Sequence, residues 1–539
     1  MGSTMISSNR RHGRTNSNAA TRGMSPGFLA QFSCSSRNVS TTVFASHERR
    51  ETSMPTISGF DNLILNTDTY KHCHHTLYPQ GTEYVSSYVE SRGGIFPATM
   101  FVGLQAYIQE RLLRPITLAD IDEAEAVTRA QGMPFCRENW MGILNDHGGF
   151  LPVEIEAVPE GTVLPTRNVL VQVINTDPKY HWVTSFFETA LLRAVWYPTT
   201  IGTVSWMCKQ IIKEAFARTS DNPDLLRFQL HDYGARGVSS QESAALGGLA
   251  HLVNFNQSDT VPGILAAMKY YNAVCPANSG PNSEHAGFTA WGRDQEVDAL
   301  RNMMNTYRDA GVVLLLTDSY DHENAVKNIL GKELKAEIEN FPGVVCARPD
   351  SGDPVQVTAD TAEWLMDAFG YEVNSKGFKV LPRYLRVVQG DGITLDTLSE
   401  IYMELERRGM AAENAIFGMG GGLLQHFNRD TLNFGQKCNA VRVNGEWRDV
   451  AKQPTGASFK VSKAGRLALV KRDGEYRTVR RDSVSPEENL LQPVYRNGKL
   501  LKKWDFSELI ERSEAEVPEE YYYPVIEQMR AQDSAAVPA

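Results

Sequence analysis

The sequence predicts an α/β barrel with an attached accessory domain of mixed α and β structure. Four apolar runs, rich in β-branched residues, each end in small or acidic residues and precede a helical stretch; they cover residues 312–321, 344–353, 385–394 and 415–422. Such runs are typical of parallel strands that helices cover on both faces. In a barrel, the loops after these strands gather at one end. An open doubly wound sheet would give a similar pattern, but no GxGxxG turn opens the first unit, so the barrel is favoured.

The N-terminal 58 residues differ from the rest of the chain. They are rich in Ser, Arg, Thr and Asn and contain no acidic residue before Glu48. Such a composition cannot bury a core, so we expect a disordered tail. The tail is similar to an organelle transit peptide. An over-long gene model, with the true start at Met24 or Met54, explains it equally well.

Residues 59–165 combine strand-like and helix-like patterns and predict an accessory α+β domain. EYVSSYVES and LPVEIEAV are strand-like, whereas ADIDEAEAVTRA is helix-like. Pairs of residues that favour two-residue hairpin turns follow at Asn444-Gly445, Asp473-Gly474 and Asn497-Gly498. We therefore expect a β-rich segment at 440–525 to complete the accessory domain. The barrel then covers 166–439, and a flexible C-terminus covers 526–539.

Composition and charge exclude several classes of protein. The net charge of -10 and the pI near 5.7 give no general attraction to nucleic acid or to anionic membranes. No apolar run approaches the roughly 18 residues that a membrane span requires. The 7 cysteines are scattered and never spaced as CxxC, which favours a reducing compartment without disulfides or a zinc ribbon. We expect a soluble, cytoplasmic protein, or an organellar one if the tail is a transit peptide.

Glycines at two strand tips predict a phosphate site. Residues 420–422 are all glycine, and the preceding unit ends in Gly390-Asp391-Gly392. Adjacent glycines at the start of a helix let backbone N–H groups approach an anion closely, and the helix dipole adds positive potential. A tight turn or close helix packing would also explain them. The Lys-Ser/Thr pair of a Walker loop is missing, which argues against an ordinary P-loop ATPase.

Charged residues occupy the other predicted strand tips. Asp318, Asp350 and Asp391 end three strands, and Arg236 and Arg348 lie beside two tips. Carboxylates suit a Mg²⁺-bound polyphosphate or sugar hydroxyls, and arginine offers paired donors to phosphate. Singly, each residue has a structural explanation, such as turn formation by Asp350. Together they indicate a site.

In order and spacing, these segments resemble the nicotinamide phosphoribosyltransferase family. The matching motifs are TDTYKHCHHTLYP, HDYGARGVSSQE, VNFNQSDTV, SEHAGFTAWG, DSYD, RPDSGDP, LRVVQGDGI, GMGGGLLQHFNRD and KCNAVRVNG, and they cover roughly residues 60–525. Family members join nicotinamide to C1 of phosphoribosyl pyrophosphate, giving nicotinamide mononucleotide and pyrophosphate in NAD salvage. The resemblance implies the irregular α/β barrel of type II phosphoribosyltransferases and a homodimer with shared active sites. It also implies Mg²⁺ and, as co-substrate, ATP.

The resemblance assigns roles to the tip residues. Asp318, Asp350 and Asp391 would face the ribose or its Mg²⁺, with Asp318 and Asp350 the candidate metal contacts, and Arg348 would lie between base and sugar. Arg236, Gly390, Gly420 and Gly421 would hold the 5′-phosphate. His285, Asp318, Asp350 and Arg348 form the expected catalytic group, in which His285 would carry a phosphoryl group from ATP. The expected contacts to pyrophosphate or nucleotide phosphates are Arg92, Arg429, Lys437 and Lys460.

For the base, the resemblance implies an aromatic slot. Nicotinamide would stack between Tyr233 and the partner subunit's Tyr70. Asp259 would accept a hydrogen bond from the carboxamide and repel nicotinate, and Asp68 and Ser279 would also bind substrate. A structural role as the N-cap of the following helix would also explain an aspartate at position 259.

Some features depart from the family pattern or leave other functions open. Tyr233, Gly280, Leu314 and Met419 replace other residue types, which affects the shape of the pocket. HCHH at 72–75 looks like a metal site, but adjacent side chains cannot all point at one ion.

Two alternative functions remain: a nicotinate phosphoribosyltransferase, against which Asp259 argues, and a catalytically silent binding or signalling protein. The latter should have lost one of the charged tip residues, and all are intact.

Overall fold

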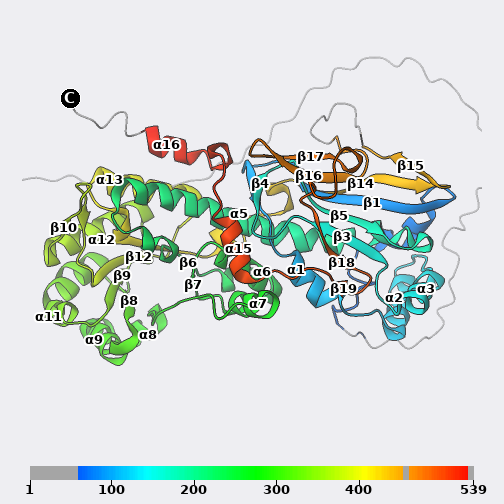
Figure 1. Ribbon diagram of the computed structural model, residues 1–539. Coiled ribbons are helices and arrows are strands. Elements are labelled where there is room, and N and C mark those ends of the chain that lie inside the picture. Colours follow the sequence, from blue (N-terminus) through cyan, green and yellow to red (C-terminus); the bar gives the residue numbers. More distant parts are fainter. Residues whose placement is uncertain (1–56, 58, 453–460, 532–539) are drawn as a thin grey trace, which may run out of the picture. The chain divides into compact units, whose positions relative to one another are not determined.

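The structure, a computed structural model, describes residue 57 and residues 59–452 and 461–531 (Figure 1). The predicted disordered tail lies outside these residues, apart from residue 57. Within them, the chain forms a parallel barrel sheet and a separate antiparallel sheet. Both predicted parts of the fold are therefore present.

Six short parallel strands form the barrel sheet, in the order β7-β6-β13-β12-β9-β8. Their bounds are β6 (Leu230–Asp232), β7 (Gln257–Ser258), β8 (Val312–Leu316), β9 (Val344–Arg348), β12 (Leu385–Gln389) and β13 (Ala415–Met419). The four apolar runs predicted as strands supply β8, β9, β12 and β13, so that prediction is confirmed. The outer helices include α6 (Gln241–Leu252), α7 (Val261–Tyr271), α9 (Glu296–Thr306), α12 (Pro354–Phe369) and α13 (Leu395–Arg407) (Figure 1).

Residues 278–282 close the barrel between its two edge strands. Asn278 forms a parallel bridge with Gln257 of β7, and Asn282 forms one with Leu314 of β8. Because isolated bridges replace a regular strand here, the barrel is irregular, as predicted. Ser279 and Asn282 of the closing segment bond Asp259, which follows β7, and Arg348, which ends β9, so the segment contributes side chains to the carboxyl ends of the strands.

The accessory sheet has seven antiparallel strands, in the order β15-β14-β1-β5-β3-β18-β19. Their bounds are β1 (Thr82–Ser91), β3 (Val153–Ala157), β5 (Val169–Asn175), β14 (Phe434–Val443), β15 (Glu446–Asp449), β18 (Gln492–Arg496) and β19 (Lys499–Leu500). The sheet thus draws strands from both sides of the barrel segment. It includes β5 and all of β14, so the accessory domain reaches beyond the predicted boundaries at 165 and 439. A continuous apolar run such as VLVQVIN fits a buried strand of either sheet.

The three predicted hairpin turns are confirmed. Asn444-Gly445 joins β14 to β15, and Asn497-Gly498 joins β18 to β19, while Asp473-Gly474 joins β16 (Leu467–Arg472) to β17 (Glu475–Arg480). Both turn residues have positive φ in each case: 50° and 84°, 46° and 82°, and 54° and 83°, respectively. This is the backbone geometry for which Asn-Gly and Asp-Gly pairs are selected.

The helix α5 (Glu188–Thr219) joins the two parts of the fold. It is buried along most of its 32 residues and contacts α6 and α13 of the barrel as well as β14 of the accessory sheet. In the accessory domain, the predicted helix at 119–130 appears as α2 (Leu118–Ala130), where Thr117 and Asp120 form a reciprocal capping box. No helix in the described part of the chain combines the length and hydrophobicity needed to cross a membrane.

The C-terminal segment predicted to be flexible from residue 526 is helical up to residue 531, and its remainder lies outside the described residues. Residues up to 531 belong to α16 (Val525–Ala531), whose Ile526 and Met529 are buried. The helix packs on α5 and α13. Burial of these two apolar side chains orders a segment whose polar and small residues suggested flexibility.

Candidate active site

His285, Asp318 and Asp350 meet at the tips of β8 and β9. His285 Nε2 lies 3.2 Å from Asp318 Oδ1, and His285 Nδ1 lies 3.9 Å from Asp350 Oδ2. Ser351 Oγ donates a 2.6 Å hydrogen bond to Asp318 Oδ2. The Asp318 side chain is 5% exposed, whereas that of His285 is 44% exposed. The imidazole is therefore oriented by a buried carboxylate and remains accessible to an incoming group.

The tip of β12 extends this acidic cluster. A Cβ atom on Gly390 would lie 3.2 Å from Asp350 Oδ1, so the β12 loop closely approaches the carboxylate. Burial raises the pKa of Asp350; Arg348 opposes this, while the charges of Asp318 and Asp391 raise it further. Three strand tips thus supply one electrostatically coupled group of carboxylates.

The ring of Tyr233 lies close to the backbone of two glycines, Gly418 and Gly390. A Cβ atom on Gly418 would come within 2.1 Å of the Tyr233 ring, and one on Gly390 would come within 3.6 Å. On the β6 side, the ring centroid of His231 lies 4.6 Å away at an interplanar angle of 36°. Gly418 is therefore required so that the aromatic ring can lie on the strand backbone.

The replacement Gly418→Ala is expected to destabilise the protein by about 1–3 kcal/mol, because the added methyl group overlaps the Tyr233 ring. The measurement is chemical denaturation of the purified protein. Gly421→Ala is the matched control, since its Cβ would meet only His426 Nε2, at 3.5 Å. Equal loss of stability in both variants would contradict this account of Gly418.

The three glycines at 420–422 are not all required for the same reason. A Cβ atom on Gly422 would lie 2.6 Å from the Ile393 carbonyl oxygen, so packing requires this glycine. At Gly420 and Gly421 the nearest atoms would lie at 3.5 Å, an ordinary contact, so packing does not explain them. The helix that follows, α14 (Gly421–Leu424), has only 4 residues. The expected contribution of a helix dipole is therefore small, and an anion here would depend on individual N–H groups.

The loop after β6 adjoins the glycine loop. A Cβ atom on Gly237 would lie 3.3 Å from the backbone nitrogen of Gly421. The exposed Arg236 precedes Gly237 in a short 3-10 turn. The predicted phosphate ligands Arg236, Gly420 and Gly421 therefore come from neighbouring loops, and Gly390 joins them through its approach to Tyr233.

Asp259 bonds His231 and Ser279 and is not a helix cap. Thr260 occupies the N-cap position of α7, and its side chain makes no capping hydrogen bond. Asp259 Oδ1 lies 3.0 Å from His231 Nε2 and accepts a short hydrogen bond from Ser279 Oγ. Burial raises the pKa of Asp259, but the hydrogen bonds from His231 and Ser279 outweigh this and lower it overall. The carboxylate is therefore held ionised, and the alternative explanation as a cap is wrong.

The remaining predicted residues form a second group on the accessory domain. Arg92, Arg429 and Lys437 form a basic cluster beside β14: a Cβ on Gly435 would lie 3.5 Å from Lys437 Nζ and 3.6 Å from Arg92 Cζ. Burial lowers the pKa of Lys437; the nearby Glu188 opposes this, while Arg92 and Arg429 add to it. Lys460 lies outside the described residues.

Asp68 and Tyr70 lie at the start of a 3-10 helix at Thr69–Thr76. Asp68 Oδ2 accepts a 2.5 Å hydrogen bond from Thr189 Oγ1, and Tyr70 is 55% exposed. A cavity of about 260 Å³, lined in part by Lys71 and Cys438, opens between this helix and β14. Among the described residues, no hydrogen bond, ion pair or ring contact joins the second group to the strand-tip cluster.

Comparisons with known proteins match this architecture. A sequence model of the nicotinate phosphoribosyltransferase (NAPRTase) family matches residues 228–499, and one of the nicotinamide phosphoribosyltransferase N-terminal domain matches residues 62–155. The chain is 47% identical to a nicotinamide phosphoribosyltransferase of Xanthomonas campestris pv. campestris over 463 residues, covering 84% of this chain and 98% of that protein. The chain belongs to the nicotinamide phosphoribosyltransferase family. A nicotinamide phosphoribosyltransferase of Acinetobacter baylyi is 29% identical, covering 84% of this chain and 97% of that protein.

Solved structures support the fold. A nicotinate-nucleotide pyrophosphorylase from Pyrococcus furiosus matches with a TM-score of 0.55 at 16% identity, covering 85% of this chain and 96% of that one. Human nicotinic acid phosphoribosyltransferase matches with a TM-score of 0.51 at 17% identity, covering 87% and 100%. These likenesses show the fold alone, that of the type II phosphoribosyltransferases.

Within the nicotinamide phosphoribosyltransferase family, the departures at Gly280 and Leu314 fit together in space. A Cβ atom on Gly280 would lie 2.4 Å from Val312 Cγ1 and 3.7 Å from Leu314 Cδ1. Leu314 is 7% exposed and packs with Cys346 inside the barrel. A larger residue at 280 would collide with β8. Packed apolar side chains, including Leu314 and Cys346, therefore fill this part of the barrel interior.

The donor set fits a magnesium ion that is held largely by substrate. Among the described residues, no three His, Cys, Asp or Glu side chains are arranged to hold a metal ion, and the HCHH segment is no exception. Mg²⁺ in phosphate-transferring sites is commonly held by one or two carboxylates together with substrate phosphates. Asp318 and Asp350 can supply these two carboxylates.

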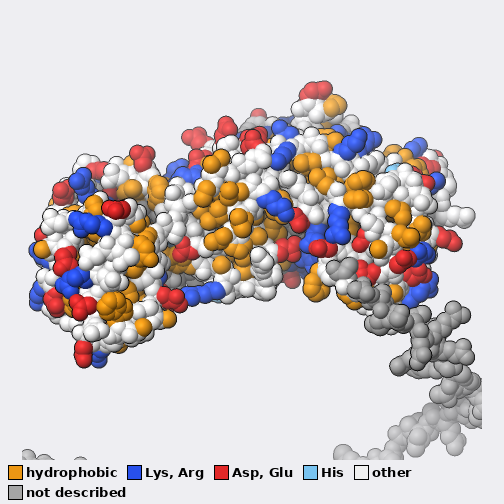
Figure 2. All heavy atoms as spheres, turned by 90° about the horizontal axis from the view of Figure 1, so that it is seen from below, with side chains coloured by type: hydrophobic (Ala, Val, Ile, Leu, Met, Phe, Trp, Pro, Cys, Tyr) orange, Lys and Arg blue, Asp and Glu red, His pale blue; other side chains and the backbone are white. Residues whose placement is uncertain are grey.

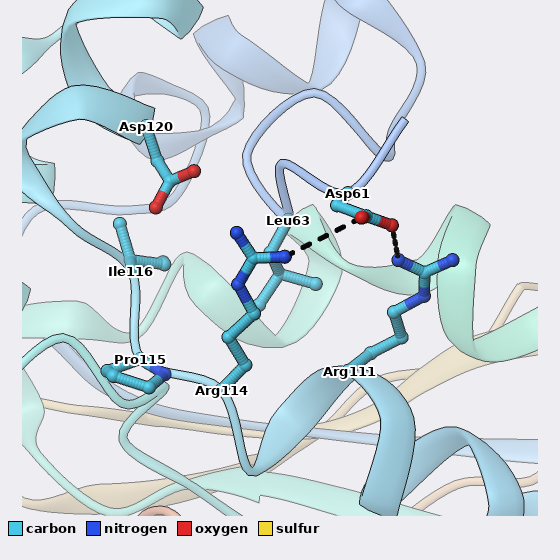
Figure 3. Close-up of a pocket in the computed structure, with 7 residues that line it drawn as sticks. All are labelled: Asp61, Leu63, Arg111, Arg114, Pro115, Ile116 and Asp120. Atoms are coloured by element: carbon cyan, nitrogen blue, oxygen red, sulfur yellow. Dashed lines mark hydrogen bonds and ion pairs between the residues drawn. The ribbon is translucent and has the colours of Figure 1, made fainter. Parts of the chain in front are cut away.

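A small cavity in the accessory domain is unsuited to a substrate (Figure 3). Its volume is about 10 Å³, which is room for a single water molecule. The guanidinium groups of Arg111 and Arg114 at its edge are both paired with Asp61 (Figure 3). Asp120 is engaged in capping α2. No anion site is therefore available there.

Sequence reasoning missed three residues of the site: His231, Asn282 and Ser351. His231 orients Asp259, Ser351 binds Asp318, and Asn282 contacts both Arg348 and Tyr233. Each lies within three residues of a predicted site residue in the sequence. Closeness in sequence to a predicted site residue could therefore have identified these three residues as candidates. It does not show which of the neighbouring side chains point into the site.

Proposed function

We propose that this protein transfers the 5-phosphoribosyl group from phosphoribosyl pyrophosphate to nicotinamide, giving nicotinamide mononucleotide and pyrophosphate. The observation that carries the proposal is the convergence of His285, Asp318 and Asp350 beside the aromatic slot of Tyr233. Membership of the nicotinamide phosphoribosyltransferase family supports the same reaction. Asp259 provides the acceptor that an uncharged carboxamide needs.

The geometry suits displacement at an anomeric carbon. As pyrophosphate leaves, the ribose gains positive charge, and carboxylates held nearby stabilise it. Asp318 is fixed for this task by Ser351 and His285. Mg²⁺, bound by Asp318 and Asp350 together with the donor's phosphates, would neutralise charge on the leaving group. Arg236 and the glycine loop would anchor the 5′-phosphate, so that the ribose is presented in a fixed orientation.

His285 would couple the reaction to ATP. A neutral imidazole has one protonated and one unprotonated nitrogen. With the Nε2 proton in a hydrogen bond to Asp318, the Nδ1 lone pair is free to attack the γ-phosphorus of ATP and to displace ADP. The 44% exposure of His285 makes it accessible to a nucleotide.

The second group of residues would act in a homodimer. Among the described residues, no hydrogen bond, ion pair or ring contact joins Tyr70, Arg92, Arg429 or Lys437 to the strand tips of their own chain, and a partner subunit would bring them to the site. A stripe of exposed apolar side chains, formed by Val261, Leu265 and Met268, runs along α7 directly after Asp259. Figure 2 shows apolar side chains gathered in the middle of the face seen from below, where Figure 1 places α7. Such a patch beside the site is suited to a subunit interface.

The replacement Asp259→Asn is expected to reduce the preference for nicotinamide over nicotinate by about 10- to 100-fold, because it removes the negative charge that repels the acid. The measurement is kcat/KM for both bases. Asp309→Asn is the matched control, since Asp309 is exposed at the opposite end of β8. An unchanged preference in Asp259→Asn or Asp259→Ser would show that the assignment is wrong.

The decisive experiment is to assay purified protein for nicotinamide mononucleotide, with and without ATP. Product from nicotinamide, and little from nicotinate, is expected. Efficient use of nicotinate instead would identify a nicotinate phosphoribosyltransferase. No product from either base would indicate a silent binding or signalling protein, although all of the charged strand-tip residues are intact.

A further inference from the structure

Asn282 is carried into the site by the segment that closes the barrel. Its backbone forms a parallel bridge with Leu314 of β8. The next residue, Ser283, donates a 3.1 Å hydrogen bond from its backbone nitrogen and a 2.9 Å bond from Oγ to the Leu314 carbonyl oxygen. Ser283 Oγ also accepts a 2.7 Å bond from the backbone nitrogen of Leu316. The position of Asn282 is therefore fixed by the barrel itself.

The Asn282 amide connects two residues assigned to substrate. Arg348 Nη1 donates a 2.8 Å hydrogen bond to Asn282 Oδ1, and Asn282 Nδ2 donates a 3.4 Å bond to Tyr233 Oη. A guanidinium group can only donate, so the amide oxygen must face Arg348 and the amide nitrogen must face Tyr233. The orientation of the amide is thus determined by its neighbours.

Arg348 depends on this contact for its orientation. It is 8% exposed, and its Nε has no hydrogen-bond partner among the described residues. Asp350 lies 4.0 Å away, at the limit of an ion pair. The bond to Asn282 is the one side-chain hydrogen bond that the described residues offer Arg348. Loss of Asn282 would leave a buried guanidinium group free to move toward the carboxylates.

Tyr233 depends on Asn282 at its hydroxyl end. Gly418 supports one side of the ring. Burial raises the pKa of Tyr233, so the phenol stays neutral. Because its oxygen accepts from Asn282, its proton remains available to a ligand or to water. The Tyr233 hydroxyl thus has a hydrogen-bond partner.

We propose that Asn282 is a positioning residue that sets the spacing between the Tyr233 ring and Arg348, and thereby the affinity for the base. The proposal rests on the proposed function, because it concerns the same site. It predicts an effect on binding more than on the chemical step, since both contacted groups meet the base before any bond breaks.

The test is steady-state kinetics of Asn282→Ala with nicotinamide as the varied substrate. Loss of two hydrogen bonds predicts a KM for nicotinamide about tenfold higher, with kcat within about threefold of wild type. Asn278→Ala is the matched control: it has the same residue type and lies in the same segment, but its side chain bonds only the Asn256 carbonyl oxygen. An unchanged KM, or equal changes in both variants, would overturn the proposal.

A double-mutant cycle with Tyr233→Phe separates positioning from general damage. If Asn282 acts partly through the tyrosine hydroxyl, Asn282→Ala should raise KM about threefold less in the Phe background than in wild type. Equal factors in both backgrounds would overturn that link. If Asn282→Ala fails to fold, Tyr233→Phe alone decides, because it removes only the hydroxyl; a KM within error of wild type would then count against the proposal.

The experiments distinguish an error in the role of Asn282 from an error in the proposed function of the protein. If wild-type protein forms no nicotinamide mononucleotide, the proposed function is wrong. If wild-type protein is active and the Asn282 and Tyr233 variants bind nicotinamide as it does, only the role of Asn282 is wrong.

Discussion

Asp318→Asn is expected to lower kcat/KM for nicotinamide mononucleotide formation by about 10²- to 10³-fold, the range typical of a lost group that stabilises charge in the transition state. Asp318 accepts hydrogen bonds from both His285 Nε2 and Ser351 Oγ, and its side chain is 5% exposed. Asparagine has only one acceptor oxygen, so it cannot accept hydrogen bonds from both His285 Nε2 and Ser351 Oγ. It also removes the negative charge opposite the developing cation.

The measurement is kcat/KM with saturating ATP and sugar donor. Asp321→Asn is the control, because it makes the same replacement in the same loop. Asp321 caps the next helix by accepting a hydrogen bond from the backbone nitrogen of Asn324, and asparagine caps helices equally well. Near wild-type activity is expected there. If Asp318→Asn retained more than about a tenth of wild-type activity, the loss would be smaller than the range for charge-stabilising groups, and the assigned role would be wrong.

His285→Ala is expected to abolish stimulation by ATP and to leave a slower, ATP-independent reaction. The alanine removes the only group at this position that can carry a phosphoryl group, but it leaves the slot and the carboxylates in place. The ratio of rates with and without ATP should therefore fall to about one, since no phosphorylated intermediate can form.

Two measurements check this result. The first is product formation with and without ATP. The second is labelling of the protein by ATP carrying a radioactive γ-phosphate, with acid-labile label expected on wild type and none on His285→Ala. A variant that still showed ATP-stimulated turnover would refute the phosphohistidine role. Asn278→Ala, in the closing segment, should label as wild type does.

Local sequence signals predicted the elements that depend on local conformation. Asn444-Gly445 and the two similar pairs form turns with positive φ at both residues, because few other residues adopt that backbone geometry at low cost. The runs at 312–321 and 344–353 became buried parallel strands, since only a sheet covered on both faces accommodates continuous apolar residues. Acidic residues at their ends therefore had to gather at one edge.

Contacts between distant segments were not predictable in this way. The segment 278–282 is polar, contains Pro281 and has no strand pattern, yet it closes the barrel. The strand at 169–175 reads as a buried strand, but its pattern does not say which sheet it joins. The pattern of apolar and polar residues indicates whether a residue is buried. It does not indicate which other segment of the chain buries it.

By itself, the sequence determined the strand–loop–helix rhythm, the hairpins and the set of charged strand tips, because each follows from residues adjacent in the chain. Only the tertiary structure decided that Gly418 makes room for Tyr233, that His231 orients Asp259, and that Asn282 joins residues 49 and 66 positions away. The physical reason is that such contacts depend on distances of a few ångströms between side chains from different strands. Those distances are set by packing of the whole barrel and are not encoded in any one segment.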